Sequence, residues 1–281
     1  MRVMTWNLWW RFGGWRERRE AIARTLEAER PDVLGLQEVW GSADGTGPDG
    51  NLAGWLAERL GMHWTWSRSP VQDRWHKRNG GDTSVDVGVA VLSRHPLLET
   101  AERRLPAGDF RDDGKTALYA SIDAPGGPLP FFTTHLNSGL GESAVRCAQL
   151  REVAAFIGER AHGAYPPVLT GDFNAEPDFD ELRLIRGYQT APAVRDLVLL
   201  DAWRFADPEL PRGTWNMTPE EAVTFGRGPS CIDYILVGVP DASRRGMIRS
   251  ARRAGHLPVD GVQPSDHAAV VAELSLGAGG A

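Results

Sequence analysis

The sequence predicts an α+β domain built from packed β-sheets and a few helices. Many short apolar stretches are separated by turn residues, as is typical of strands, and few stretches have helical spacing. The strands come in runs instead of alternating one by one with helices, which favours layered sheets. With 281 residues, of which 42% are hydrophobic, the chain can form one large core. We therefore expect a single domain over residues 1–276 and a frayed tail at 277–281.

Eight stretches have the composition and length of strands. The clearest is V85-D-V-G-V-A-V-L92, in which every odd-numbered position is Val. Because alternate side chains of a strand point to opposite faces, Asp86 and Gly88 lie on the face away from these valines. The predicted strands are residues 2–8, 32–39, 85–92, 118–122, 129–136, 168–170, 232–237 and 267–274.

Three longer stretches have apolar residues at helical spacing. The first ends before Pro31, because a residue that precedes proline avoids the helical conformation. The second places Leu52, Leu56 and Leu60 on one face and ends at Gly61, since glycine readily adopts the left-handed conformation after a helix. The predicted helices are residues 15–30, 51–60 and 142–160.

Charge and cysteine content narrow the class of protein. The formal net charge is −6, whereas a protein that binds nucleic acid mainly by neutralising phosphates is usually basic. We expect the short basic stretches at residues 16–19, 74–78 and 244–253 to be solvated surface. Cys147 and Cys231 lack metal-type spacing and are expected to be reduced thiols of a cytoplasmic protein. No apolar stretch has the length of a membrane helix, and a monomer without an obligate protein partner is expected.

Polar residues stand repeatedly at the ends of the predicted strands. Each has an ordinary explanation on its own, such as a turn, a helix cap or a surface side chain. Together they would place many polar groups near one rim of a sheet, where burial without partners is costly. A shared site for a metal ion and a phosphate would explain the set. Its members are Asn7, Glu38, His135, Asn137, Asp172, Asn174, Asp233, Asp266 and His267.

The donor atoms of this set favour a hard cation. Carboxylate and amide oxygens suit Mg²⁺, with Mn²⁺ as a substitute, whereas Cys and multiple His ligands suit zinc. No Cys lies in the set, and two histidines are too few for a typical zinc cage. The cation would neutralise the charge of a phosphodiester and polarise a phosphoryl oxygen. An Asp or a His would take the proton from the attacking water.

Seven short motifs follow one another from residue 5 to residue 267: T5-W-N-L8, L36-Q-E-V39, G88-V-A-V-L-S-R94, T134-H-L-N137, G171-D-F-N174, I232-D-Y-I235 and S265-D-H267. In these motifs and their order the sequence resembles the endonuclease/exonuclease/phosphatase superfamily. This superfamily comprises metal-dependent phosphodiesterases related to pancreatic-type deoxyribonuclease, exonuclease III and neutral sphingomyelinase. The resemblance implies a four-layered αββα sandwich of two packed mixed β-sheets flanked by helices, with the site at one edge of the two sheets.

The resemblance also implies roles for the polar residues. Glu38, with Asn7 nearby, resembles the main magnesium ligand. Asp266 resembles the acidic residue that completes this metal site or a second one. Asp172 would orient or deprotonate the attacking water, and Asn174 would hold a phosphate oxygen.

Two histidines complete the implied site. Asp233 and His267 resemble the Asp–His pair of the family. His135 resembles the second histidine of the deoxyribonuclease and sphingomyelinase branches, close to the leaving oxygen. An imidazole needs an orienting partner, and for His135 we expect Asp86, since a carboxylate among apolar neighbours is costly unless paired. An Asp86 exposed to solvent is the alternative.

Four further residues are expected to contact the substrate: Arg146, Asn137, Trp75 and Lys77. Arg146 lies early in the helix after the His135 motif, where a structural salt bridge is an equal alternative, and Lys115 is a similar case. The loop at residues 72–83 is mildly basic and carries one tryptophan. Cationic and aromatic groups together can meet a phosphate and a base, although a flexible surface loop is the alternative.

The combined pattern predicts a Mg²⁺-dependent phosphodiesterase acting by in-line attack of water, with a nuclease as the favoured case. A phosphomonoesterase or a sphingomyelinase-like enzyme acting on a small or lipid phosphate is the alternative. The inositol-phosphate 5-phosphatase branch is disfavoured, because G171-D-F-N-A-E176 and I232-D-Y234 depart from its motifs. A binding module without activity would have lost part of the set, and the sequence shows no such loss.

Overall fold

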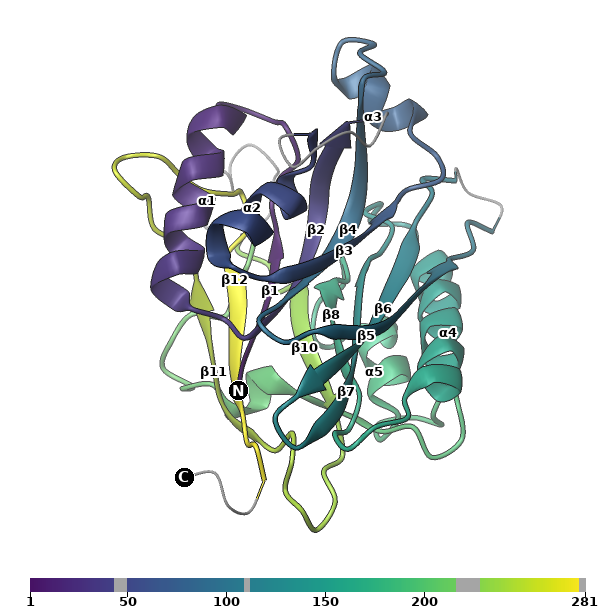
Figure 1. Ribbon diagram of the computed structural model, residues 1–281. Helices are drawn as coiled ribbons and strands as arrows, with labels where there is room; N and C mark the ends of the chain where they lie inside the picture. Colours follow the sequence, from purple (N-terminus) through teal and green to yellow (C-terminus); the bar gives the residue numbers. More distant parts are fainter. Residues whose placement is uncertain (43–49, 109–111, 216–227, 278–281) are drawn as a thin grey trace.

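Two β-sheets pack face to face and carry helices on both outer faces (Figure 1). The computed structural model describes residues 1–42, 50–108, 112–215 and 228–277. The arrangement is the predicted αββα sandwich. Residues 278–281, in the predicted tail, lie outside the described residues.

The first sheet joins the two ends of the chain. Strands β1 and β2 are parallel, whereas β12 pairs with β1 and β4 pairs with β2 in the antiparallel sense, so the sheet is mixed. The strand order is β11 (Ile248–Ala254), β12 (Ala269–Leu274), β1 (Arg2–Asn7), β2 (Val33–Ser42), β4 (Val85–Ser93) and β3 (His63–Arg68).

The second sheet is also mixed. Strands β7 and β8 are parallel, and β10 is antiparallel to β8. The strand order is β5 (Leu97–Arg104), β6 (Thr116–Ala124), β7 (Gly127–His135), β8 (Val168–Asp172), β10 (Asp233–Gly238) and β9 (Leu199–Asp201).

The helices cover the sheets as their apolar faces require. Helix α2 begins after Asn51, whose side chain accepts from two backbone N–H groups of the first turn, and ends at Gly61 with φ of 64°. The short α3 lies at one end of the sandwich, inside the segment predicted as a loop (Figure 1). The helices α1 (Trp15–Glu29) and α2 (Leu52–Leu60) flank the first sheet, and α4 (Ser143–Arg160) and α5 (Asp180–Arg186) flank the second; α3 is Asp73–Arg78.

Alternation along the strands divides the apolar side chains between two cores. Val3 and Val33 point between the sheets, where they join the core formed with the second sheet. Their neighbours Met4 and Leu34 point to the opposite face and pack with Ile22 of α1. Both faces of the first sheet are therefore buried, which explains why its central strands are almost uniformly apolar.

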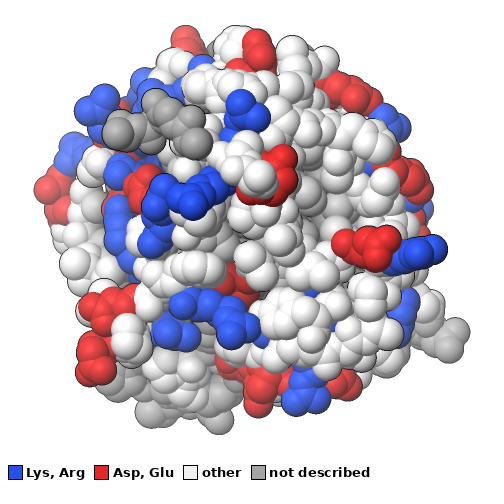
Figure 2. Space-filling view, turned by 90° about the horizontal axis from the view of Figure 1, so that it is seen from below, with Lys and Arg blue, Asp and Glu red and all other residues white. Residues whose placement is uncertain are grey.

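The charged surface is mixed at the end of the sandwich where the two chain termini lie. Figure 2 shows this end, with basic and acidic side chains interspersed among uncharged ones. No described helix has the length and apolar composition needed to cross a membrane. Cys147 and Cys231 are free thiols, as expected.

Candidate active site

Three polar residues form one row across the second sheet. Strand β7 ends at His135 and the parallel β8 ends at Asp172, and these residues are register partners. The antiparallel β10 begins at Asp233, which pairs with Asp172 from the other side. The row forms because two parallel strands end where their antiparallel neighbour begins.

The first sheet adds Asn7, which contacts this row across the interface between the sheets. Nδ2 of Asn7, at the end of β1, donates to Oδ2 of Asp172 at 3.0 Å. Oδ1 of Asn7 accepts from the backbone N–H of Trp9 at 3.0 Å. The backbone N–H of Asn174, which has φ of 50°, donates to the other oxygen of Asp172 at 3.0 Å. Asp172 is thus held from both sheets.

Both histidines face the same carboxylate. Nε2 of His135 lies 3.5 Å from Oδ2 of Asp172, and Nε2 of His267 lies 3.8 Å from that oxygen. Nδ1 of His267 lies 2.9 Å from Oδ2 of Asp233, so the structure contains the predicted Asp–His pair. All four side chains are buried.

Burial and neighbouring charges give these groups unusual pKa values. Burial, together with the charge of Asp233, raises the pKa of Asp172 to about 7. Burial alone would lower the pKa of His267, but nearby carboxylates, Asp233 foremost, raise it well above the usual value. Burial and the Lys115 ammonium hold the pKa of His135 well below its usual range. The pKa values of the two histidines are therefore shifted in opposite directions.

Glu38 enters the site through an irregularity in its strand. The pairing of β2 with β4 shifts between Leu36 and Val39, and Glu38 has φ of 50°. Leu36 and Val39 both pack in the core beneath the helices. A bulge of this kind re-aims a side chain that regular alternation would direct elsewhere, and here Glu38 lines the cleft with His267.

Asp266 supplies a second carboxylate close to Glu38. Burial raises the pKa of Asp266 to about 6, and the negative charge of Glu38 contributes to the shift. Oδ1 of Asp266 is buried without a hydrogen-bond partner among the described residues. A buried carboxylate oxygen without a partner, beside a second negative charge, fits a hard cation.

A second group of donors lies in the row itself. Ligand atoms of Asp172, Asp233 and His267 lie within 4.8 Å of one another. A cation bound by all three would compete with the hydrogen bond between His267 and Asp233. Glu38 and Asp266 make no bond to each other or to His267 that a cation would have to break among the described residues, and Oδ1 of Asp266 has no partner there, so this pair fits a cation better.

The site opens into a cleft of about 640 Å³. This volume suits a ligand of nucleotide size. Strand ends contribute acidic groups to the cleft, and α3 and the start of β6 contribute basic ones. Aromatic rings complete the lining. The lining residues that matter below are Phe12, Glu38, Arg74, Trp75, Arg78, Lys115, Asp172, Asp266 and His267.

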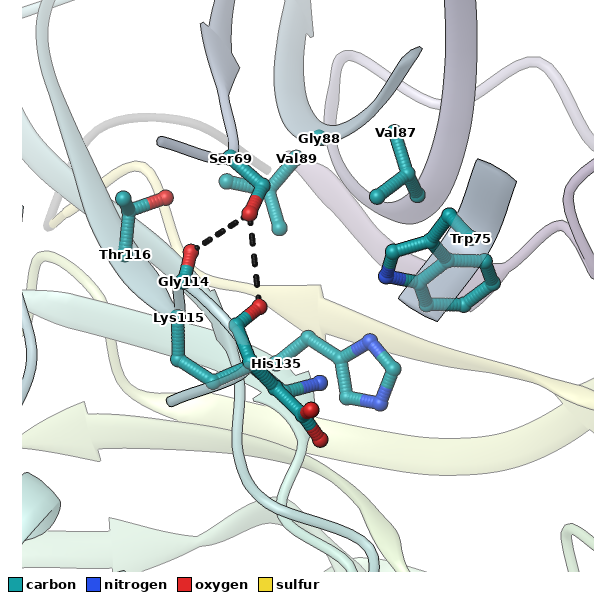
Figure 3. Close-up of a pocket in the computed structure, with 10 residues that line it drawn as sticks. Ser69, Trp75, Val87, Gly88, Val89, Gly114, Lys115, Thr116 and His135 are labelled. Atoms are coloured by element: carbon teal, nitrogen blue, oxygen red, sulfur yellow. Dashed lines mark hydrogen bonds between the residues drawn. The ribbon is translucent and has the colours of Figure 1, made fainter. Parts of the chain in front are cut away.

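Lys115 is a buried cation in this cleft. Its side chain extends towards the ring of His135 (Figure 3). Its ammonium group makes no hydrogen bond or ion pair within the described part of the chain, and burial lowers its pKa to about 8. Gly114 precedes it with φ of 64°, and a Cβ there would lie 2.3 Å from Oγ of Ser69. The Ser69 hydroxyl donates to the backbone oxygen of Gly114 at 2.8 Å and so holds the backbone that leads into Lys115.

Arg18 shows that one basic stretch is not solvated surface. It lies in residues 16–19, yet it is 4% exposed. Its guanidinium donates to backbone oxygens from two distant segments, the one that follows β1 and the one that precedes Asp266. It therefore ties two parts of the site together, which no local pattern in the sequence indicates. The accepting residues are Leu8, Trp9, Trp10, Phe12 and Pro264.

The predicted pairing of Asp86 with His135 is wrong. Asp86 is fully buried, as the argument from its apolar neighbours required. Its two oxygens contact Nε of Arg68 at 2.5 Å and Nε2 of His76 at 3.1 Å. His135 faces Asp172 instead, because both residues end adjacent strands.

Two of the predicted substrate contacts are structural. Arg146 is 1% exposed and donates to Glu181 at 2.8 Å and to the backbone oxygen of Gly139 at 2.6 Å. Asn137 is equally buried, and its side-chain oxygen accepts from Gln149 at 2.9 Å. The guanidinium of Arg146 is held by these partners, whereas Nδ2 of Asn137 is buried without a hydrogen-bond partner among the described residues.

The segment at residues 72–83 does reach the cleft. Trp75 lines it, as predicted. Lys77 is exposed but lies outside the lining, whereas Arg74 and Arg78 are part of it. The basic stretch at residues 74–78 is thus a wall of the cleft and not only solvated surface, because a short helix turns two of its arginines inward.

Known proteins share this sequence pattern. The sequence profile of the Endonuclease/Exonuclease/phosphatase family matches residues 4–267. The chain belongs to this family. Its members are hydrolases that act on phosphoric esters and depend on metal ions. The phosphoester hydrolase expected from the motifs is therefore confirmed at the level of the family.

Individual proteins with similar sequences are consistent with this family assignment. The chain is 30% identical over 227 residues to a putative neutral sphingomyelinase of Caenorhabditis elegans, covering 73% of this chain and 46% of that one. It is 29% identical over 234 residues to Nocturnin of Rattus norvegicus, covering 79% and 49%. The chain spans about half the length of these curated relatives.

Solved structures share the fold. The human Nocturnin catalytic domain with bound sulfate anion superposes with a TM-score of 0.72 at 23% identity, covering 98% of this chain and 94% of that one. The endonuclease/exonuclease/phosphatase from Beutenbergia cavernae superposes with a TM-score of 0.68 at 26% identity, covering 99% and 72%.

Proposed function

We propose that the protein is a Mg²⁺-dependent phosphodiesterase that hydrolyses its substrate by in-line attack of water, with a nuclease as the favoured case. The observation that carries the proposal is the environment of Asp172. This buried carboxylate faces His135 and His267 and accepts a hydrogen bond from Asn7. The carboxylate of Asp172, which can act as a base, the imidazole of His267 and the amide of Asn7 therefore meet at one place in the cleft.

Asp172 is suited to take the proton of the attacking water. Its pKa of about 7 lets it accept a proton near neutral pH. His267, held cationic by Asp233, would bind a negatively charged phosphoryl oxygen. His135 would lie near the leaving oxygen, and Asn174 would hold another phosphate oxygen. The buried ammonium of Lys115 would offset the charge of the scissile phosphate.

Glu38 and Asp266 would hold the metal ion, with Asn7 beside them. The ion, Mg²⁺ or Mn²⁺, would neutralise phosphate charge and polarise a phosphoryl oxygen. Support comes from the oxygen-only donor set and from the unpartnered oxygen of Asp266. We further propose that the protein works as a single-domain monomer in the cytoplasm.

A sphingomyelinase-like activity on lipid or a phosphomonoesterase activity is the second candidate. It is favoured by the 30% identity with a putative neutral sphingomyelinase. The two candidates differ in the group attached to the phosphate, which the chemistry of the cleft must recognise.

A substrate panel tests the proposal. Plasmid DNA, single-stranded RNA, sphingomyelin, inositol phosphates and bis-p-nitrophenyl phosphate are each incubated with Mg²⁺ or with EDTA. We expect hydrolysis of nucleic acid in Mg²⁺ and none in EDTA. Glu38→Ala and His267→Ala should abolish it, while Lys77→Gln, outside the cleft, should not. Activity that persists in EDTA would overturn the metal mechanism, and wild-type rates in both alanine variants would overturn the site.

A further inference from the structure

Arg78, in the lining of the cleft, has its guanidinium over two aromatic rings. Its guanidinium carbon lies 4.5 Å from the ring centroid of Phe12 and 5.6 Å from that of Trp75. Among the described residues it has no ion pair or hydrogen bond, and it lines the cleft. Stacking fixes the plane of a guanidinium and leaves its N–H edge free, which prepares it for a phosphate. Arg74, Trp75 and Arg78 with Phe12 are called the α3 wall below.

Three basic side chains line the cleft beside its carboxylates. Arg74 is paired with Asp113 at 2.6 Å. Lys115 and Arg78 have no such partner within the described part of the chain. Lys115 lies close enough to Asp172 for their charges to interact, whereas Arg78 extends from α3. Two cations without ion pairs, from two different elements, indicate two anionic groups on one ligand.

We propose that the α3 wall binds a second phosphate of the substrate, beyond the one that is hydrolysed. The inference rests on the proposed phosphodiesterase function and names its substrate class, an oligonucleotide or nucleotide with at least two phosphates. A phosphocholine headgroup fits the α3 wall itself poorly, although Trp9 and Trp215 also line the cleft. Its quaternary ammonium would seek the faces of aromatic rings, and Arg78 already covers those of Phe12 and Trp75.

A buried network holds the α3 wall in place. Nε2 of Gln72, just before α3, donates to the backbone oxygens of Ser69 at 2.7 Å and Val87 at 3.0 Å. His76, within α3, contacts the fully buried Asp86 at 3.1 Å. Asp86 is therefore a positioning residue for the α3 wall, which explains a buried carboxylate that the hydrolytic centre does not use.

Binding of two matched ligands tests the proposal. The dinucleotide thymidylyl-thymidine is compared with the same dinucleotide carrying a 5′-phosphate, by calorimetry in EDTA to suppress turnover. We expect the wild type to bind the phosphorylated ligand about tenfold more tightly. Arg78→Gln should lose this preference while binding the unphosphorylated ligand as before. Lys77→Gln removes the same charge from the same helix, outside the cleft, and should keep the preference.

A separate variant tests the positioning role of Asp86. His76→Gln leaves Arg78 in the sequence but weakens the attachment of α3 to Asp86. It should reduce the preference for the phosphorylated ligand, with unfolding temperature used to exclude global damage. Equal affinity of the wild type for both ligands, or an unchanged preference in Arg78→Gln, would overturn the proposal. A preserved preference together with no hydrolysis of any substrate of the panel in Mg²⁺ would leave the phosphate subsite standing and refute the proposed phosphodiesterase.

Discussion

Oδ2 of Asp233 lies 2.9 Å from Nδ1 of His267, and the opposite ring nitrogen of His267 faces Asp172. This pairing fixes both the orientation and the charge of the imidazole. Asp233→Asn keeps the shape but removes the charge that raises the pKa of His267. We expect the pKa of His267 to fall, and kcat to drop by about 100-fold or more. NMR titration of the histidines together with kcat against pH measures both effects. An unchanged kcat would show that the pair does not serve hydrolysis.

Lys115 should cost stability in the free protein because its charge is buried and has no ion pair with any residue that the structure describes. Its pKa falls from 10.5 to about 8, which corresponds to about 3 kcal/mol at neutral pH. Lys115→Met should therefore raise Tm in EDTA at pH 7 while lowering activity. Below pH 8 both folded and unfolded states carry the proton, so the gain is full. It should shrink as pH rises from about 8 to 10.5, because Lys115 becomes neutral in the folded protein first.

The control for this variant is Lys77→Met, which alters the other lysine of the chain, an exposed one. Its Tm should match the wild type across the same pH range. Sulfate should stabilise the wild type more than Lys115→Met, since the anion would offset the buried charge. If Lys115→Met destabilised the protein at pH 7, the ammonium would have partners that compensate its burial.

The central strands were predictable from the sequence, and the edge strands were not. β11 and β3 are the edges of the first sheet, and β5 and β9 are those of the second. None of the four was predicted. β5 has only half-buried and exposed side chains, and β11 carries the basic stretch that indicated solvated surface. Edge strands carry charged residues that discourage further pairing, and this weakens the apolar signal on which the prediction depends.

The candidate site was likewise predictable from the sequence only in part. Residues at the ends of apolar strands, such as Asn7, His135 and Asp172, were predictable because strand ends gather at one rim. The partner of Asp86 was not, since it depends on where α3 packs. Arg18 and Arg78 were also missed. Arg18 donates to a backbone oxygen that is distant in sequence, and Arg78 packs on a ring that no sequence motif marks.

Metal binding should depend on Glu38 and be visible without any activity measurement. A cation that binds only the folded state raises Tm as its concentration rises. We expect Mg²⁺ or Mn²⁺ to stabilise the wild type and Glu38→Gln to lose most of this effect, because the amide removes one negative ligand. Glu58→Gln, an exposed change on α2, is the matched control. Equal metal-induced shifts in both variants would place the ion elsewhere, with the donors of Asp172 and Asp233 as the next candidates.

Arg146 should matter for stability and not for substrate affinity. Its guanidinium is buried against Glu181, which is fully buried as well. Arg146→Met leaves that carboxylate without its counter-ion, at an expected cost of about 3–5 kcal/mol. Urea unfolding should show this loss, whereas KM at a temperature well below Tm should stay unchanged. Arg151→Met, an exposed change on the same helix, should leave both quantities unaltered.

A double variant separates the ion pair from packing effects at Arg146. Arg146→Met with Glu181→Leu removes both buried charges and should recover much of the lost stability, because an apolar pair of similar volume needs no counter-ion. Full recovery is not expected, since Arg146 also binds the backbone oxygen of Gly139, four residues after His135. A raised KM in Arg146→Met with stability intact would reverse the assignment and return Arg146 to the substrate. The buried position of its guanidinium argues against that outcome, because a substrate would first have to displace Glu181.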